Sequence, residues 1–158
     1  MKQRISLLQR ELSQPKPFVS PAQEGVVALL LTADLLRRRL IEIIEPHGIT
    51  LQQYNVLRIL RGADEGLPTM TIGERMIEQT PGLTRLLDRL EAKDLVHRVR
   101  GDDDRRQVRC TISAAGLALL KTLDPAVDAA DERLLSPLGE KEQRKLVEML
   151  EAIRSGNS

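Results

Sequence analysis

The feature that most constrains the fold is a change of hydrophobic periodicity within residues 71–112. Up to Leu90 the apolar residues recur every three or four positions, which places them on one face of an α-helix. The segments 95–99 and 108–112 instead carry short apolar patterns, and the second alternates with polar residues as a half-buried strand does. An acidic turn that contains glycine, residues 101–104, lies between them. This arrangement predicts helices followed by a β-hairpin.

The other elements follow from capping residues and helix breakers. Ser20, Thr50 and Thr71 each stand three residues before Gln or Glu, which is the spacing of a capping box. Thr80–Pro81 combines a capping side chain with a proline at the first helical position. The Gly- and Pro-containing residues 62–68 predict a loop. The predicted helices comprise residues 4–12, 21–45, 51–61, 71–78, 81–93, 114–135 and 140–154.

The predicted fold is therefore mainly α, of the α+β class. Two helices across a short turn, followed by a two-stranded wing, have the order of a winged helix-turn-helix. The chain of 158 residues is long enough for one hydrophobic core.

The amino-acid composition excludes several kinds of function. A formal net charge of +1, from 24 Lys and Arg against 23 Asp and Glu, excludes a globally basic nucleic-acid binder but not a local basic edge. Aromatic residues make up 1% of the chain, too few for a base-stacking surface. One Cys and two His are too few for a dedicated zinc site. We expect no metal and no cofactor.

Nothing in the sequence predicts a secreted or membrane protein. The first residues lack the apolar stretch of a signal peptide. The longest apolar run, residues 26–31, is far shorter than the roughly 18 residues that span a bilayer. Cys110 is the only cysteine and cannot form an intrachain disulfide, which fits a reducing compartment. We expect a cytoplasmic protein without a membrane partner.

Four segments resemble the MarR family of bacterial transcriptional regulators. They are ITLQQYNVL at 49–57, TIGERM at 71–76, TRLLDRLEAKDLV at 84–96, and DRRQVR with TIS and a glycine at 104–116. Each segment is weak alone, but the four follow the family's order and spacing. The resemblance implies a homodimeric winged-helix protein that binds double-stranded DNA, often as a repressor released by a small, frequently phenolic, ligand.

The chain departs from the family pattern in the turn between the two helices of the motif. The usual Gly of that turn is replaced around residues 77–79, and the cap moves to Thr80–Pro81. This departure affects the tilt of the recognition helix. Asp94 also stands where the family often has Gly.

The resemblance and the apolar pattern divide the chain into three parts of one intertwined domain. Residues 1–48 are expected to be N-terminal dimerisation helices, 49–113 a winged helix-turn-helix DNA-binding lobe, and 114–158 C-terminal dimerisation helices. The apolar stripes at both ends exceed what one small lobe can cover, and twofold symmetry is the default for homo-oligomers. We therefore expect a homodimer that binds an inverted-repeat operator.

The candidate DNA-binding residues lie on the recognition helix and on the wing. We expect the helix, 81–93, to lie in the major groove and the wing, 99–107, in the minor groove. An Arg near the start of such a helix can pair with guanine, and a Thr can contact a phosphate or a thymine methyl. The candidates are Thr80, Pro81, Gly82, Thr84, Arg85, Arg89, Arg98, Arg100, Arg105 and Arg106.

Two alternatives compete with these assignments. The outer face of the helix could be an ordinary solvated face, with ion pairs such as Arg85–Asp88 or Arg89–Asp94. The acidic residues 102–104 could instead form a metal or catalytic site. Consecutive residues of a turn diverge, however, and no partner base is present.

Three further residues have two interpretations each. By resemblance, Tyr54 lines a pocket for a small aromatic effector; otherwise it is a core residue with its hydroxyl at the rim. His47 follows a helix end, where a cation is favoured, and is a second candidate for the effector site. Cys110 is interpreted as a small buried hydrophobe, rather than as a redox thiolate, which would need exposure and nearby cations.

The function favoured by the sequence is thus a MarR-type DNA-binding transcriptional regulator. The alternative is a winged-helix module that binds another protein without specific DNA binding, since a fold does not dictate function. An enzyme is not expected, because the chain carries no Ser/His/Asp, Cys/His or phosphate-loop arrangement.

Overall fold

A computed structural model describes residues 6–79, 81–100 and 108–157 of the chain. The chain divides into two compact units, residues 1–39 and residues 40–158. Each unit is considered separately below, and helix α2 contributes to both. Among the helices of the described residues, none combines the length and apolar character needed to cross a bilayer.

The first unit contains α1 (Leu7–Glu11) and most of α2 (Pro21–Ile44). The predicted start of α2 is confirmed, because the Ser20 hydroxyl accepts from the backbone N–H of Gln23 at 3.2 Å. The full capping box is not formed. The Gln23 side chain accepts from the N–H of Val19 at 2.7 Å rather than from Ser20. The Gln23 carboxamide therefore provides an acceptor for the backbone N–H of Val19, the residue before the cap.

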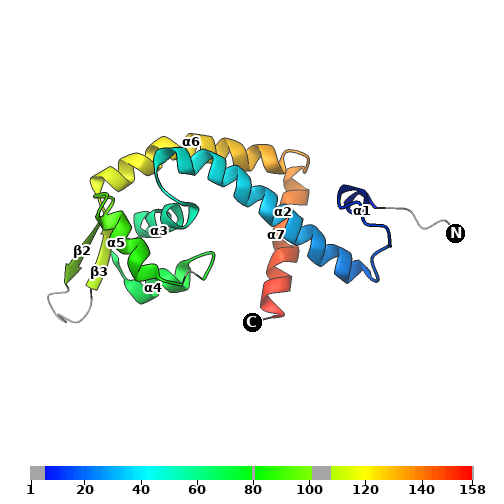
Figure 1. Ribbon diagram of the computed structural model, residues 1–158, viewed down its shortest axis with the longest axis horizontal. Coiled ribbons are helices and arrows are strands. Elements are labelled where there is room, and N and C mark those ends of the chain that lie inside the picture. Colours follow the sequence, from blue (N-terminus) through cyan, green and yellow to red (C-terminus); the bar gives the residue numbers. More distant parts are fainter. Residues whose placement is uncertain (1–5, 80, 101–107, 158) are drawn as a thin grey trace. The chain divides into compact units, whose positions relative to one another are not determined.

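The second unit has the element order of a winged helix (Figure 1). Three helices gather beside a small sheet, and α6 begins where β3 ends. After the end of α2, the elements are η1 (Glu45–His47), α3 (Leu51–Arg61), β1 (Leu67–Pro68), α4 (Thr69–Arg75), α5 (Leu83–Glu91), β2 (Val96–Arg100), β3 (Val108–Ile112), α6 (Ala114–Leu135) and α7 (Glu140–Ser155).

Two helix starts are fixed by caps that the sequence predicted. Thr50 and Gln53 form a reciprocal capping box at α3, with N···O distances of 3.2 and 3.0 Å. Ser113 caps α6 by accepting from the N–H of Gly116 at 2.9 Å. Such caps satisfy amide groups that have no partner within the helix.

The predicted hairpin is confirmed, with Val96 opposite Ile112 and Arg98 opposite Cys110 in antiparallel register. The sheet has a third strand that the sequence did not reveal. Leu67–Pro68 pairs with β3, in the order β1-β3-β2, where a loop was predicted over 62–68. Two residues with a proline give no periodic signal, and Pro is tolerated here because β1 is an edge strand.

The predicted capping box at Thr71 is wrong. Helix α4 begins two residues earlier, at Thr69, directly after the strand pairing of Pro68, and it ends at Arg75. The sheet contact therefore decides where this helix starts. Met76 then takes an extended conformation, so the predicted extension of the helix to residue 78 is also wrong.

The predicted start of the recognition helix at Pro81 is wrong as well. Gly82 adopts the left-handed conformation, with φ of 82°, and α5 runs from Leu83 to Glu91. A left-handed residue cannot lie within a right-handed helix, and glycine adopts this conformation without the steric cost that other residues incur. Asp94 is also left-handed, with φ of 56°, which explains why glycine suits this position.

The core of the second unit is built from aliphatic side chains of α3, α4, α5, the sheet and α6. Tyr54 is the only aromatic residue among its buried members. The largest fully buried side chains are Ile44, Leu57, Leu60, Ile72, Leu87, Leu90, Leu120 and Leu123. Because α5 contributes Leu87 and Leu90 from one face, its opposite face is directed to solvent.

Candidate nucleic-acid interface

The outer face of α5 presents a polar surface to solvent. Thr84, Arg85, Asp88 and Arg89 are all exposed, whereas Leu87 is buried. Arg85 and Arg89 are one helical turn apart and therefore lie on the same face. Neither forms an ion pair with any described residue, so the alternative pairs Arg85–Asp88 and Arg89–Asp94 are not formed. Both guanidinium groups are available to a ligand.

The start of α5 is open to a close approach. Gly82 is exposed, has no side-chain cap, and a Cβ placed there would meet no atom within 4 Å. Pro81 is also exposed, and the first turn of α5 contains no acidic residue. Free amide groups at the start of a helix favour an anion such as a phosphate. Thr80, the remaining candidate at this end, lies outside the described residues.

Arg98, a candidate from β2, does not extend into solvent. Its guanidinium pairs with the Asp88 carboxylate at 2.7 Å and donates to the backbone carbonyl of Thr84 at 3.2 Å. Its Nε lies 3.7 Å from a carboxylate oxygen of Glu91, and its own backbone N–H donates to Glu91 at 3.2 Å. Partial burial lowers its pKa, but the hydrogen bond and charge of Asp88 outweigh this and raise the pKa overall, so the cation is retained. Arg98 thus connects the wing to the recognition helix.

Arg105, Arg106 and the acidic residues 102–104 lie outside the described part of the chain. The backbone of Arg100 ends β2, and its side chain is not described.

Polar side chains that the sequence did not single out hold the helix-turn-helix in place. Asn55 of α3 accepts from the backbone N–H of Ile77 at 3.0 Å, which fixes the turn before α5. Arg109 of β3 donates to the carbonyls of Glu65 and Gly66 at 3.2 and 3.0 Å and holds the segment before β1. Both residues lie within segments that resemble the family, but nothing in the sequence indicated these contacts, because the partners are backbone groups more than 20 positions away.

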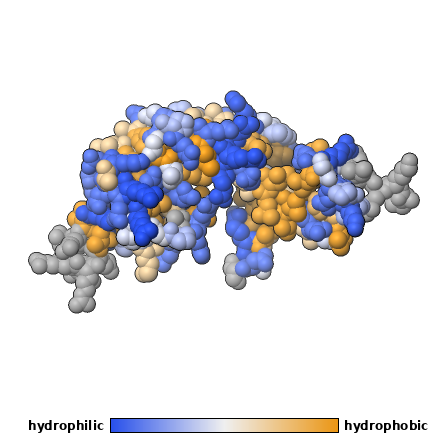
Figure 2. All heavy atoms as spheres, in the orientation of Figure 1, coloured by the Kyte–Doolittle hydropathy of each residue, from blue (hydrophilic) through white to orange (hydrophobic). Residues whose placement is uncertain are grey.

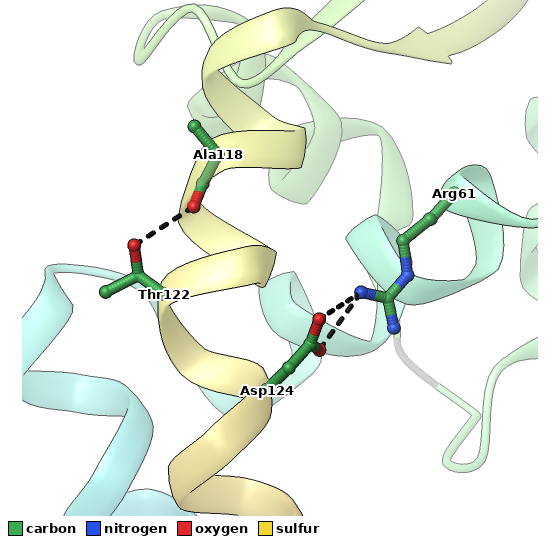
Figure 3. A network of polar contacts seen from close by, with 4 residues as sticks. All are labelled: Arg61, Ala118, Thr122 and Asp124. Carbon is green, nitrogen blue, oxygen red and sulfur yellow. Dashed lines mark hydrogen bonds and ion pairs between the residues drawn. The ribbon is translucent and has the colours of Figure 1, made fainter.

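An ion pair at the surface adds to the core packing between α3 and α6. Figure 3 shows Arg61 of α3 directed at Asp124 of α6, and one nitrogen of Arg61 lies 3.0 and 2.7 Å from the two carboxylate oxygens. In the same view the hydroxyl of Thr122 donates to the carbonyl of Ala118 within α6, at 3.1 Å. The pair fixes the middle of α6 to the winged helix.

The two candidate effector residues differ in exposure. The Tyr54 ring belongs to the core, and only 4% of the residue is exposed. The Arg58 guanidinium lies 5.9 Å from the centre of the ring, close enough for a cation–π contact. Burial raises the pKa of the Tyr54 hydroxyl, and the nearby Arg58 lowers it by less. His47 is exposed, in the turn before α3.

Cys110 is fully buried in β3, as the sequence predicted. Burial raises the pKa of its thiol, more than the neighbouring Thr69 and Arg98 lower it, so little thiolate forms near neutral pH. We expect iodoacetamide to leave Cys110 unmodified in the native protein at neutral pH and to alkylate it once guanidinium unfolds the chain, measured by mass spectrometry. Rapid alkylation under native conditions would show instead that the thiol is accessible.

The geometry defines a class of protein: a helix-turn-helix formed by α4 and α5, followed by a β2–β3 wing. The comparisons with known proteins narrow this class. Residues 47–107 match the model of the MarR family. The chain is 30% identical over 121 residues to the HTH-type transcriptional repressor Rv2887 of Mycobacterium tuberculosis, covering 77% of this chain and 86% of that protein. The chain belongs to the MarR family of transcriptional regulators, and its relatives are regulators rather than enzymes.

Other relatives support this assignment. The HTH-type transcriptional regulator MhqR of Bacillus subtilis is 29% identical over 110 residues, which is 70% of this chain and 75% of that protein. The crystal structure of a MarR transcription factor from Planctomyces limnophilus is 36% identical, with a TM-score of 0.65, and covers 86% of this chain and 99% of that one. A Staphylococcus aureus MepR–DNA complex shares the fold at 22% identity, with a TM-score of 0.75 over 82% of this chain and 95% of that one.

Proposed function

We propose that the protein is a homodimeric, sequence-specific DNA-binding regulator that acts as a repressor. The observation that carries this proposal is the outer face of α5, where Arg85 and Arg89 are exposed without ion pairs to described residues. Leu87 and Leu90 anchor the opposite face in the core. A rigid helix with unpaired guanidinium groups beside an open N-terminus can read base edges while its first amides bind a phosphate.

We assign α5 to the major groove and the wing to the minor groove. Thr84 and Arg85, near the start of α5, are the candidates for base contacts, and Arg89 is a candidate for the phosphate backbone. Arg105 and Arg106 of the wing are proposed to act in a narrow, electronegative groove. The full proposed set remains Thr80, Pro81, Gly82, Thr84, Arg85, Arg89, Arg100, Arg105 and Arg106; the contacts of Arg98 favour a different role for it.

We propose that the ends of the chain form the dimer. Large hydrophobic side chains are exposed on α2, as Figure 2 shows at the surface where this helix runs, and also on α1 and α7. They include Leu7, Val26, Leu30, Val147, Met149 and Ile153. Exposed apolar surface of this kind marks an interface. The proposed division is residues 1–48 and 114–158 for dimerisation, with residues 49–113 for DNA binding.

A small aromatic effector is a second part of the proposal. The resemblance to the MarR family implies that such a ligand releases the repressor from DNA. One relative, the homoprotocatechuate degradative operon repressor of Escherichia coli, is 26% identical over 133 residues. Tyr54 and His47 are the proposed contacts. A ligand can shift the protein between two states only if it binds one of them more tightly. Because Tyr54 is buried, the effector would have to bind a state in which α3 is repacked.

The test is to select duplexes from a random library with the wild-type protein and to measure their affinity as salt is varied. We expect an inverted repeat whose half-sites are about one helical turn apart, because a twofold dimer presents two copies of α5. Affinity should fall steeply with salt, by a slope of about 0.9 for each phosphate contacted. Light scattering should give about twice 17.7 kDa for the free protein.

Two results would contradict the proposal. A monomer at micromolar concentration would remove the basis for an inverted repeat. Absence of duplex binding at low salt would favour the alternative, a winged-helix module that binds another protein.

A further inference from the structure

The contacts of Arg98 give it a role different from that of the other basic residues near α5. Arg98 is at the centre of β2, yet its guanidinium reaches Thr84 and Asp88 on the first two turns of α5. Glu91 at the end of the helix contacts both the side chain and the backbone of Arg98. One residue of the wing therefore contacts groups from the first to the last turn of the recognition helix.

The burial of Arg98 shows that this arrangement is not a loose surface pair. Only 22% of the side chain is exposed, and its Nε is buried without a hydrogen-bond partner among the described residues. A buried N–H without a partner is costly. The guanidinium must therefore be held in this position by its remaining contacts, the carboxylate of Asp88 and the carbonyl of Thr84.

The position of the two carboxylates matters for a helix that approaches DNA. Asp88 is exposed, with 55% of its side chain accessible, and it lies on the outer face of α5 together with Arg85 and Arg89. An uncompensated carboxylate there would repel phosphates, since like charges in a desolvated interface are strongly unfavourable. Arg98 supplies the opposite charge from beneath the helix.

We propose that Arg98 is a positioning residue for DNA recognition: it fixes α5 relative to the wing and neutralises Asp88, without touching DNA itself. This inference rests on the proposed DNA-binding function. It replaces the sequence-based assignment of Arg98 as a DNA contact. It also predicts that Arg98 and Asp88 act as a coupled pair, whereas a direct phosphate contact would be independent of Asp88.

The test is a double-mutant cycle with Arg98→Gln, Asp88→Asn and the double variant, using the library-selected duplex and a random duplex as probes. Arg98→Gln should weaken binding to both duplexes by about tenfold, because the Asp88 charge is no longer compensated. Adding Asp88→Asn should restore binding to the random duplex to within about twofold of wild type, while the selected duplex stays weaker because α5 is no longer held.

The salt dependence separates positioning from contact. If Arg98 touched a phosphate, Arg98→Gln would lower the slope of log affinity against log salt by about 0.9 per protomer. We expect instead that the double variant keeps the wild-type slope, because the carboxylate that Arg98 compensates is absent there. A slope lowered by that amount, with equal effects of Asp88→Asn in both backgrounds, would overturn the proposal. So would binding of Arg98→Gln to both duplexes at wild-type strength.

Hydrogen exchange without DNA tests the positioning directly. The amides of residues 84–91 should exchange faster in Arg98→Gln than in wild type, while those of α6 should not change. Arg98→Lys keeps the charge but loses the planar fork, so it should bind the random duplex normally and the selected duplex several-fold more weakly. If the wild-type protein binds no duplex, the proposed DNA-binding function fails. If hydrogen exchange in α5 is the same in Arg98→Gln as in wild type, the positioning role fails, whether or not the protein binds DNA.

Discussion

Replacing Gly116 by Ala should destabilise the protein by about 3 kcal/mol, at the upper end of the cost of overpacking. A Cβ at this position would lie 2.8 Å from Cγ1 of Ile112 and closer still to the carbonyl oxygen of Leu95. The carbonyl is backbone and cannot rotate away, and the same Leu95 oxygen accepts from the N–H of Ser113 at 3.1 Å. The first turn of α6 therefore packs directly on the chain entering the wing.

Gly25→Ala provides a matched control. Gly25 also lies within a helix, but a Cβ there would meet no atom within 4 Å. Alanine is favoured over glycine in a helix by about 1 kcal/mol, so this variant should be as stable as wild type or more so. In thermal unfolding, the melting temperature of Gly116→Ala should be roughly 6–12 °C below that of wild type, at about 2–4 °C for each kcal/mol. Equal melting temperatures for both variants would contradict the close contact between α6 and Leu95.

Arg85→Ala should abolish most of the discrimination between the selected operator and random duplex. Loss of a bidentate contact to guanine costs about 1–3 kcal/mol, and two half-sites make this about 2–6 kcal/mol for the dimer. Arg85 is exposed near the start of α5 and forms no ion pair with described residues, so its removal should not disturb the fold. The measurement is the ratio of affinities for the two duplexes at fixed salt.

Arg144→Ala is the control for charge. The side chain of Arg144 in α7 is 75% exposed and pairs with Glu140 of the same helix, so removing it changes the net charge by the same amount away from α5. We expect this control to leave the affinity ratio unchanged. If Arg85→Ala weakens both duplexes equally, Arg85 contacts a phosphate, and Thr84 and Gly82 become the candidates for base recognition.

The sequence predicted the long helices and the hairpin well because their signals are local. Thr50 and Ser113 cap helices through residues three positions away, and the alternation in 108–112 is that of β3. The errors at Thr71 and Pro81 have a different origin. There, local capping motifs compete with a strand pairing at Pro68 and a left-handed Gly82, and the tertiary structure decides the outcome.

The candidate site was predictable only in part for the same reason. The hydrophobic positions of α5 fix which face is exposed, so Thr84, Arg85 and Arg89 could be assigned from the sequence. The contacts of Arg98 with α5 could not be assigned, because a basic residue in a wing carries no local signal of its partners. Its partners, Thr84 and Asp88, are 10 to 14 positions away and belong to a different element.

The attachment of α6 has a mechanical consequence. Its first turn is fixed at Leu95 through Ser113 and Gly116, and the ion pair of Asp124 with Arg61 fixes it again near its middle. The helix of 22 residues is a lever arm about 33 Å long, at about 1.5 Å for each residue. Because the arm is about 33 Å long, a rotation of the winged helix by about 5° would displace its far end by about 3 Å. A small rotation of the winged helix is thus converted into a larger displacement at Leu135, the far end of α6.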